Sequence, residues 1–277
     1  MLKKYLTLSA VAVVAIVSLF MLPKSVVDNE NDGSVAQNGV ASENEEAAPV
    51  GNNTDHTAAL PENAQQELSE LREAFENNKS SENFVNFANS LIERFASVNQ
   101  FDSAAKYAAE LAAVDNTAAN LQKAGDLYYE AFTYAMDDEK SQKMGKQARY
   151  YYEQLMEKDP KQLDAKAKMA MTYVSSSNPM QGIQMLREVL DADSDNQTAI
   201  YNLGLLSMQS GQYDRAVERF EKLVELEPKN LQAQFLLGVS YFETGEKPKA
   251  KAQFEKVKSL DADPSVAASV DEYLNRL

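Results

Sequence analysis

Apolar and small residues recur every 34 positions in the C-terminal half of this chain. Gly204 is followed by Phe220, and Gly238 is followed by Phe254 at the same separation. Between these positions the apolar residues lie three or four apart, which places them on one face of a helix. The pattern therefore predicts successive pairs of amphipathic helices, with one pair in each 34-residue unit.

The same register extends backwards through the chain. It predicts five units at about 85–117, 118–162, 163–196, 197–230 and 231–264. The second unit carries about ten extra residues around 137–147, which predicts either a longer helix pair or a protruding turn. After the last unit, Asp263 and Pro264 suit the N-cap and first turn of a closing helix, which we place at 265–277.

Small residues stand where two helices must approach closely, and large ones stand where the space between them must be filled. Pro160 and Pro228 end the second helix of a unit, because proline cannot continue a helix. The defining positions hold Gly125, Ala148, Pro160, Gly204, Ala216, Phe220, Pro228, Gly238, Ala250 and Phe254. These residues resemble the tetratricopeptide repeat family. The resemblance implies an all-α, right-handed superhelical solenoid of about five helix-turn-helix repeats with a C-terminal capping helix.

The resemblance also implies a concave groove lined by the first helix of each repeat. Its positions hold Met171, Tyr201, Leu205, Met208, Phe235, Val239 and Phe242. This apolar and aromatic strip suits the apolar side of a helix or another hydrophobic segment of a partner protein. In the alternative interpretation, the same residues pack internally against adjacent repeats and the capping helix.

The N-terminal residues have a different pattern. Residues 5–22 form a run of 18 uncharged, mostly apolar residues behind Lys3 and Lys4. As a helix the run would span roughly 27 Å, close to the hydrocarbon thickness of a bilayer. We expect residues 1–24 to be a transmembrane anchor, because the end of the run offers no small-residue cleavage site. A cleaved signal peptide is the alternative.

The lysines before the run favour a cytoplasmic N-terminus. In a bacterium this orientation gives a single-pass inner-membrane protein with its C-terminal domain in the periplasm. The alternatives are a domain that faces the cytoplasm and a domain that is secreted after cleavage.

Between the anchor and the repeats the composition becomes polar and acidic. Residues 25–60 contain no aromatic residue, which predicts a disordered linker. Order is expected to resume at 61–80, where Leu68, Leu71 and Phe75 form one apolar helical stripe. This helix either opens the folded region or forms a short self-associating coil.

Charge and composition limit the functions and the kinds of site that the chain can have. The formal net charge of −15 repels nucleic-acid phosphates. The chain has no cysteine, and His56, its single histidine, lies in the linker. The repeats therefore lack the histidine of a catalytic triad and the usual ligands of a zinc site. We expect no catalytic residue, no metal and no cofactor, and a protein that is not an enzyme.

The expected function is therefore protein binding. We expect a membrane-tethered adaptor or chaperone-like protein of the bacterial cell envelope that recruits a partner through the concave groove. The alternative is a structural scaffold that self-associates as a homo-oligomer and has no transient client.

Overall fold

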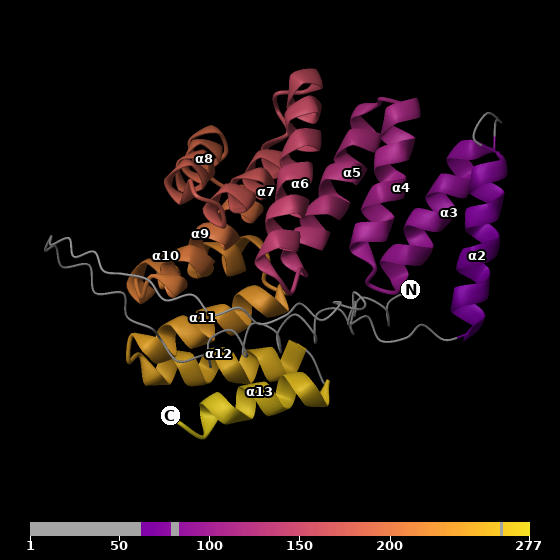
Figure 1. Ribbon diagram of the computed structural model, residues 1–277. Coiled ribbons are helices and arrows are strands. Elements are labelled where there is room, and N and C mark those ends of the chain that lie inside the picture. The colour runs from indigo at the N-terminus through magenta and orange to yellow at the C-terminus, as the bar shows by residue number, and fades with distance from the viewer. Residues whose placement is uncertain (1–61, 79–82, 261–262) are drawn as a thin grey trace, which may run out of the picture.

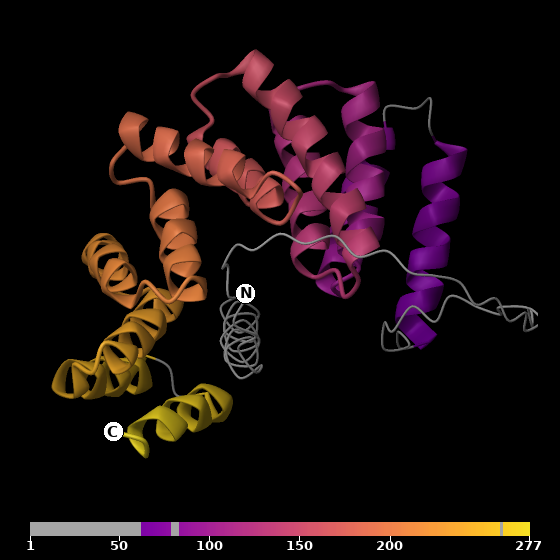
Figure 2. The same cartoon turned by 60° about the vertical axis from the view of Figure 1, so that its left-hand side comes forward.

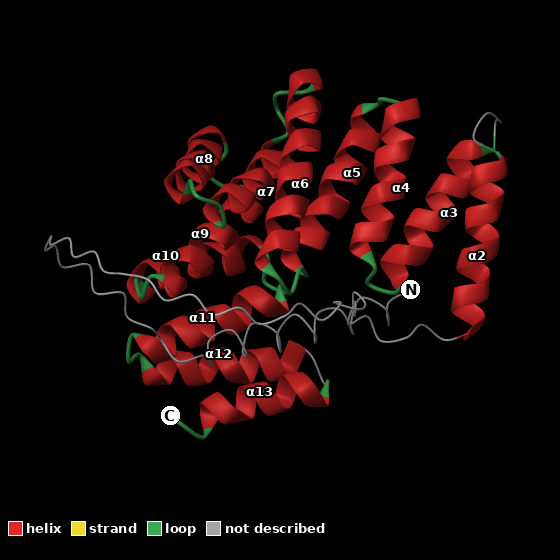
Figure 3. Ribbon diagram, in the orientation of Figure 1, coloured by secondary structure: helices red, strands yellow, loops and turns green. Residues whose placement is uncertain are grey.

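The computed structural model describes residues 62–78, 83–260 and 263–277. These residues form twelve helices and no strand (Figure 3), which confirms the expected all-α fold class. The predicted anchor at 1–24 and the predicted linker at 25–60 lie outside the described residues. Among the helices that are described, none combines the length and the apolar character needed to cross a membrane.

The helices follow one another as antiparallel pairs, and each pair occupies one of the five predicted units. The pairs are α3 (Phe84–Ser97) with α4 (Phe101–Val114), α5 (Ala118–Thr133) with α6 (Asp138–Lys158), α7 (Leu163–Val174) with α8 (Pro179–Ala192), α9 (Gln197–Gln209) with α10 (Tyr213–Leu226), and α11 (Leu231–Glu243) with α12 (Lys247–Leu260). Helix α2 (Glu62–Asn77) precedes the pairs and α13 (Pro264–Leu274) follows them.

Local sequence sets where these helices begin and turn. Asn196 and Asn230 are the N-caps of α9 and α11, and each side chain accepts a backbone N–H bond at 2.9 Å. A cap of this kind contributes about 1 kcal/mol. The turns that follow these two helices contain Gly211 and Gly245 with φ of 71° and 79°, a conformation that glycine adopts without strain. The fourth and fifth repeats thus share both a cap and a turn.

Inside three of the five repeats, a glycine on the first helix faces an aromatic ring on the second. A Cβ atom at any of these glycines would lie 2.7 to 2.8 Å from the ring, too close for any larger residue. The equivalent positions of the third repeat hold Ala170 and Leu186, both fully buried, which are a slightly larger and a smaller residue than those of the other pairs. The three glycine pairs are Gly125 with Tyr152, Gly204 with Phe220, and Gly238 with Phe254.

The extra residues of the second repeat lengthen its helices. Helix α6 has 21 residues, whereas α8, α10 and α12 have 14 each. The N-cap of α6 is Asp137, whose side chain accepts the backbone N–H of Lys140 at 2.7 Å. Of the two predicted alternatives, the longer helix pair is the one that forms.

The pairs stack into a curved solenoid. In Figure 1, α2 to α6 stand roughly parallel while α11 to α13 run across them, and Figure 2 shows the chain following an arc. Helix α5 contacts α7, and α7 contacts α9, but α6, α8 and α10 make no comparably extensive contacts with one another. The first helices of the second, third and fourth repeats therefore lie closer together than their second helices, on the inside of the curve.

Both ends of the solenoid are covered. At one end, the ring centroid of Phe75 on α2 lies 5.1 Å from those of Phe84 and Tyr107. At the other end, α13 buries Val266 and Val270 completely. Terminal helices of this kind keep the apolar face of the last repeat out of water. Helix α2 thus packs against the first repeat at the start of the described solenoid.

Candidate functional site

The structure separates the predicted groove residues into two groups. Met208, Phe235 and Val239 are only 1, 1 and 3% exposed, so they belong to the hydrophobic core and offer no surface to a partner. For these three residues the prediction of a binding groove is wrong. Phe242 and Met171 are half-buried, as are Tyr201 and Leu205.

Helix α13 explains part of this burial. Its Tyr273 ring packs edge-on against Phe235 and Phe242, with centroid distances of 5.7 and 5.5 Å. The Arg276 guanidinium lies 4.9 Å above the Phe242 ring. The chain thus covers the inner face of α11 with its own C-terminal helix, and Phe242 is occupied by an internal contact.

The inner face of the middle repeats is arranged differently. Met171 lies on α7, while Tyr201 and Leu205 lie one turn apart on α9, and each side chain is half-buried against the core. Since α7 contacts both α5 and α9, these three residues face the same stretch of the concave surface as α5. They are the part of the predicted strip that remains accessible.

Four polar and aromatic residues that the sequence interpretation missed lie beside them. The Nζ of Lys168 on α7 lies 2.7 Å from the Oδ1 of Asp126 on α5. The same oxygen accepts a hydrogen bond of 2.8 Å from the Tyr152 hydroxyl, which comes up from the core. Tyr129 and Glu130 follow on α5, one turn further along. We call the whole set the concave site: Asp126, Tyr129, Glu130, Lys168, Met171, Tyr201 and Leu205.

Burial shifts the acid–base behaviour of the site. It raises the pKa of Tyr129 to about 12, with help from the negative charge of Glu130. It raises the pKa of Tyr201 as well, and Tyr129 adds to that shift. The pKa of Glu130 is raised by burial against the opposing effect of Lys168, and Asp126 reinforces the rise. Neighbouring groups of the site therefore interact electrostatically in a partly dehydrated environment.

The charges of the site do not balance. Lys168 is the single cation beside two carboxylates, and its ion pair is with Asp126. Glu130 has no ion pair within 4.0 Å among the described residues. A half-buried carboxylate without a partner favours the approach of a positive charge, which would replace part of its lost hydration.

The sequence contains a signal for two of the site residues that were not predicted, Asp126 and Tyr129. When the register of the third repeat is transferred to the longer second repeat, Asp126 takes the place of Met171. The same shift brings Tyr129 to the inner face. Neither was predicted as a groove residue, because Asp126 is charged and the extra residues of the second repeat obscure the register of Tyr129.

The site does not have the composition of a metal centre. In the part of the chain that the structure describes, no group of three or more His, Cys, Asp or Glu side chains is placed to hold a metal ion. The chemistry that the site offers is an aromatic and apolar surface with a net negative charge.

Comparisons with known proteins support the helical repeats. Residues 207–270 match the tetratricopeptide repeat family model. A crystal structure of a tetratricopeptide repeat protein from Parabacteroides merdae is similar with a TM-score of 0.53 and 16% identity, over 76% of this chain and 78% of that one. This chain has a tetratricopeptide-repeat fold.

Other solved structures are similar at lower scores. MamA from Desulfovibrio magneticus RS-1 has a TM-score of 0.45 and 18% identity, over 63% of this chain and 93% of that one. YrrB, described as a tetratricopeptide repeat protein with an unusual peptide-binding site, has a TM-score of 0.42 and 20% identity, over 73% and 97%. No curated protein matches the chain.

Tetratricopeptide repeats generally mediate contacts between proteins. The fold is a scaffold for such contacts and is not typically catalytic. What any one repeat protein binds depends on the residues that its surface presents.

Proposed function

We propose that this protein is a binding module that uses the concave site to hold a segment of a partner protein in which an apolar side chain lies next to a lysine or arginine. The observation that carries the proposal is the half-buried Glu130, without an ion pair among the described residues, next to Tyr129, which in turn interacts with Tyr201.

The apolar half of the proposed ligand would contact Tyr201, Leu205 and Met171. Each of these side chains keeps part of its apolar surface in water, and covering such surface contributes about 25 cal/mol per Å². A methionine in this position adapts to ligands of different shape. Tyrosine rings supply a large contact area at a small cost in conformational entropy.

The charged half of the ligand would lie at Glu130. A cation there would give Glu130 a direct ion pair like the one that Lys168 makes with Asp126. Because the carboxylate is already partly dehydrated, binding removes less water from it than from an exposed glutamate.

A peptide-binding experiment tests both halves. A dye-labelled peptide of alternating Leu and Lys is titrated with the full-length protein, next to a peptide in which Gln replaces each Lys. We expect the lysine peptide to bind at least about tenfold more tightly, which corresponds to about 1.4 kcal/mol. Equal binding of the two peptides would show that Glu130 does not contribute to binding.

Matched variants locate the binding surface. Tyr201→Ala with Leu205→Ala removes apolar contact from the concave site, whereas Val114→Ala with Met180→Ala removes two apolar side chains that are each 67% exposed elsewhere. We expect only the first pair to weaken peptide binding and crosslinking to partners. Equal loss in both pairs would point to a general apolar effect and would overturn the proposal.

We further propose that the protein works in the bacterial cell envelope, tethered to the inner membrane by residues 1–24 with the repeats in the periplasm. The support is the length of the apolar run and the lysines in front of it. A reporter that is active only in the periplasm, fused after Leu277, tests the orientation. An active reporter in a soluble fraction would instead favour cleavage and secretion.

The alternative function is self-association into a structural scaffold, which an experiment must distinguish from peptide binding at the concave site. Sedimentation of the full-length protein in detergent distinguishes the two. A monodisperse monomer that binds the lysine peptide supports the binding module. A stable oligomer whose interface includes Tyr201 and excludes the peptide would support a scaffold.

A further inference from the structure

A hollow lies next to the concave site, at the turn ends of the second and third repeats, where the Phe132 ring in its lining lies 5.9 Å from the Tyr129 ring, centroid to centroid. It has a volume of about 580 Å³ and lies between α6, the end of α7 and the serines at 175–177. We call it the α6–α7 cleft, lined by Phe132, Lys143, Lys146, Arg149 and the serines at 175–177. The volume is within the range of small-ligand and peptide sites.

The extra turns of α6 build one wall of this cleft. Lys143 and Lys146 lie in the N-terminal half of α6, the part that lengthens the second repeat. Gly145, between them, allows Phe132 to come close, since a Cβ atom at this position would lie 3.1 Å from the ring. The insertion thus brings together an apolar ring and a row of cations.

The cations of the cleft differ in whether they already have a partner within the protein. Arg149 is held in place, because its Nη1 atom donates hydrogen bonds of 3.0 and 3.1 Å to the carbonyl oxygen and the hydroxyl of Thr172. Its guanidinium also lies 4.8 Å above the Tyr173 ring. Lys143 and Lys146 are exposed and form no ion pair among the described residues. The one acidic side chain in the lining is Glu139.

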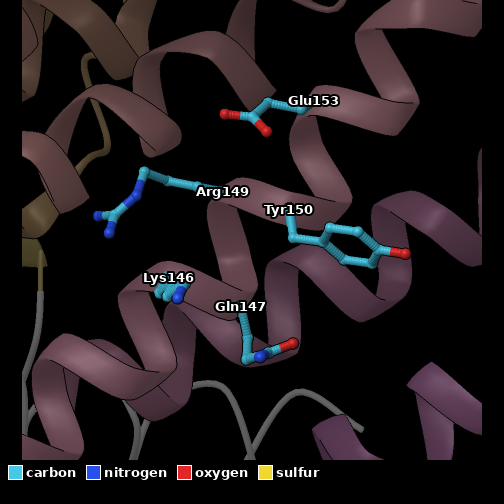
Figure 4. Close-up of a pocket in the computed structure, with 5 residues that line it drawn as sticks. All are labelled: Lys146, Gln147, Arg149, Tyr150 and Glu153. Atoms are coloured by element: carbon cyan, nitrogen blue, oxygen red, sulfur yellow. The ribbon is translucent and has the colours of Figure 1, made fainter.

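A second hollow of about 490 Å³ adjoins the same cations. Lys146 and Arg149 line both hollows, and the second also includes Gln147, Tyr150 and Glu153. Figure 4 shows Arg149 and Tyr150 extending to opposite sides of α6. The positive charge is therefore accessible along α6 over more than one turn.

The spacing of the cations indicates the shape of the ligand. Lys143, Lys146 and Arg149 follow each other at three-residue intervals, so they extend over roughly 9 Å of helix. Several carboxylates along an extended chain match this spacing better than a single small anion does, and the Phe132 ring in the same lining offers a contact for an apolar side chain.

The net charge of the protein selects against larger anions. With a charge of −15, the chain repels nucleic acid and anionic membrane surfaces at long range. Screening at physiological ionic strength limits this field to about 8 Å, so a short acidic segment senses mainly the local lysines. We propose that the α6–α7 cleft binds a short acidic segment of a partner protein, independently of the concave site.

The test uses the full-length protein and a dye-labelled peptide of alternating Asp, Glu and Phe, with a control peptide in which Asn and Gln replace the acids. Fluorescence anisotropy measures affinity at low and at physiological salt. We expect the acidic peptide to bind, the amide peptide to bind at least about tenfold more weakly, and the difference to shrink as salt is added.

Variants locate the site. Lys143→Glu with Lys146→Glu reverses the charge of the cleft, while Lys161→Glu with Lys256→Glu makes the same change in net charge at exposed positions outside it. We expect the first pair to weaken binding by at least about tenfold and the second to leave it nearly unchanged. Circular dichroism confirms that both pairs are folded, and the milder Lys143→Gln with Lys146→Gln pair serves if the first is not.

Two results would overturn the proposal. The first is acidic-peptide binding that survives the cleft variant. The second is binding that falls equally in both charge-reversal pairs, since this would reflect only the overall charge. The Tyr201→Ala, Leu205→Ala variant separates this site from the concave site, because acidic-peptide binding should persist in it.

Discussion

The second and fifth repeats are built on the same interior contact. In the second, Gly125 faces the ring of Tyr152, and in the fifth, Gly238 faces the ring of Phe254. The two aromatic residues differ by one hydroxyl group, and this group donates a hydrogen bond to Asp126 on the inner face. In the second repeat a hydrogen bond thus connects the core to the concave site, whereas the Phe254 ring of the fifth repeat has no group that could donate such a bond.

The two repeats also differ in what covers their inner faces. Helix α13 packs over the fifth repeat, with Tyr273 stacked 5.1 Å from Phe254. The inner face of the second and third repeats keeps Tyr129, Glu130 and Met171 partly accessible. The comparison teaches that a repeat covered by the terminal helix serves the structure, while the irregular second repeat contributes residues to both candidate binding surfaces.

The largest expected effect comes from the core of the fifth repeat. Phe254→Ala removes a fully buried ring that contacts Phe235 and Tyr273. We expect a loss of about 3 to 5 kcal/mol in the free energy of unfolding of the C-terminal repeats. Denaturant titration followed by circular dichroism measures the loss, and hydrogen exchange should localise it to α11, α12 and α13. A loss below about 1 kcal/mol would contradict the packing described.

A smaller effect is expected when the interior pair is made to resemble that of the third repeat. Gly204→Ala places a Cβ atom against Phe220, which we expect to cost about 1 to 3 kcal/mol. Adding Phe220→Leu recreates the combination of Ala170 with Leu186. The double variant should therefore be more stable than the sum of the single changes predicts, in a double-mutant cycle measured by denaturant unfolding. Strict additivity would mean that the two residues do not share this space.

Removal of the Tyr152 hydroxyl is expected to lower the stability by a still smaller amount. Tyr152→Phe keeps the fully buried ring and removes the hydrogen bond to Asp126, which costs about 0.5 to 1.5 kcal/mol. Phe254→Tyr in the fifth repeat is the matched control, because it adds a buried hydroxyl instead of removing one. We expect both changes to lower the denaturation midpoint. A more stable Tyr152→Phe variant would contradict the proposed connection between core and site.

The smallest effect concerns Glu130 and has a defined pH dependence. Since burial raises its pKa, the folded protein holds this proton more tightly than the unfolded chain does. The stability contributed by the protonated group is complete below the unfolded pKa and is lost as the pH rises through the raised value. Glu130→Gln stays uncharged, so it should be more stable than wild type at neutral pH, by less than about 1 kcal/mol because the side chain is partly exposed.

Melting temperatures over a pH series measure this effect. The gain in Glu130→Gln should disappear in acid, where the wild-type carboxyl is protonated. The same variant should bind the lysine peptide less tightly, so that stability and binding change in opposite directions. A variant that is less stable at neutral pH would show that Lys168 compensates Glu130 fully.

Much of the fold could be predicted from the sequence because its signals are local and repeated. Gly204, Gly238, Phe220 and Phe254 recur at one spacing, and the spacing alone places two helices face to face. Asp263 and Pro264 mark a helix start, and in the structure Asp263 accepts the backbone N–H of Ser265 at 2.8 Å. Neither signal depends on what the rest of the chain does.

The binding surface could be predicted only in part. Tyr201 and Leu205 share the register of Phe235 and Val239, yet the first two are accessible and the last two are buried. The sequence pattern is the same at both sites, so it cannot distinguish them. For Phe235 the difference comes from α13, whose Tyr273 ring packs against it.

The sequence by itself determined the repeat unit, the helix pairs and the small residues at their contacts, because helix periodicity and close packing act between neighbours in the chain. Tertiary structure alone decided which inner faces stay open, because that depends on where a terminal helix docks. It also brought Lys168 to Asp126, 42 positions away, and placed Lys143 and Arg149 along a cleft with the serines of the next repeat. Charges that act through space leave no periodic trace in the sequence.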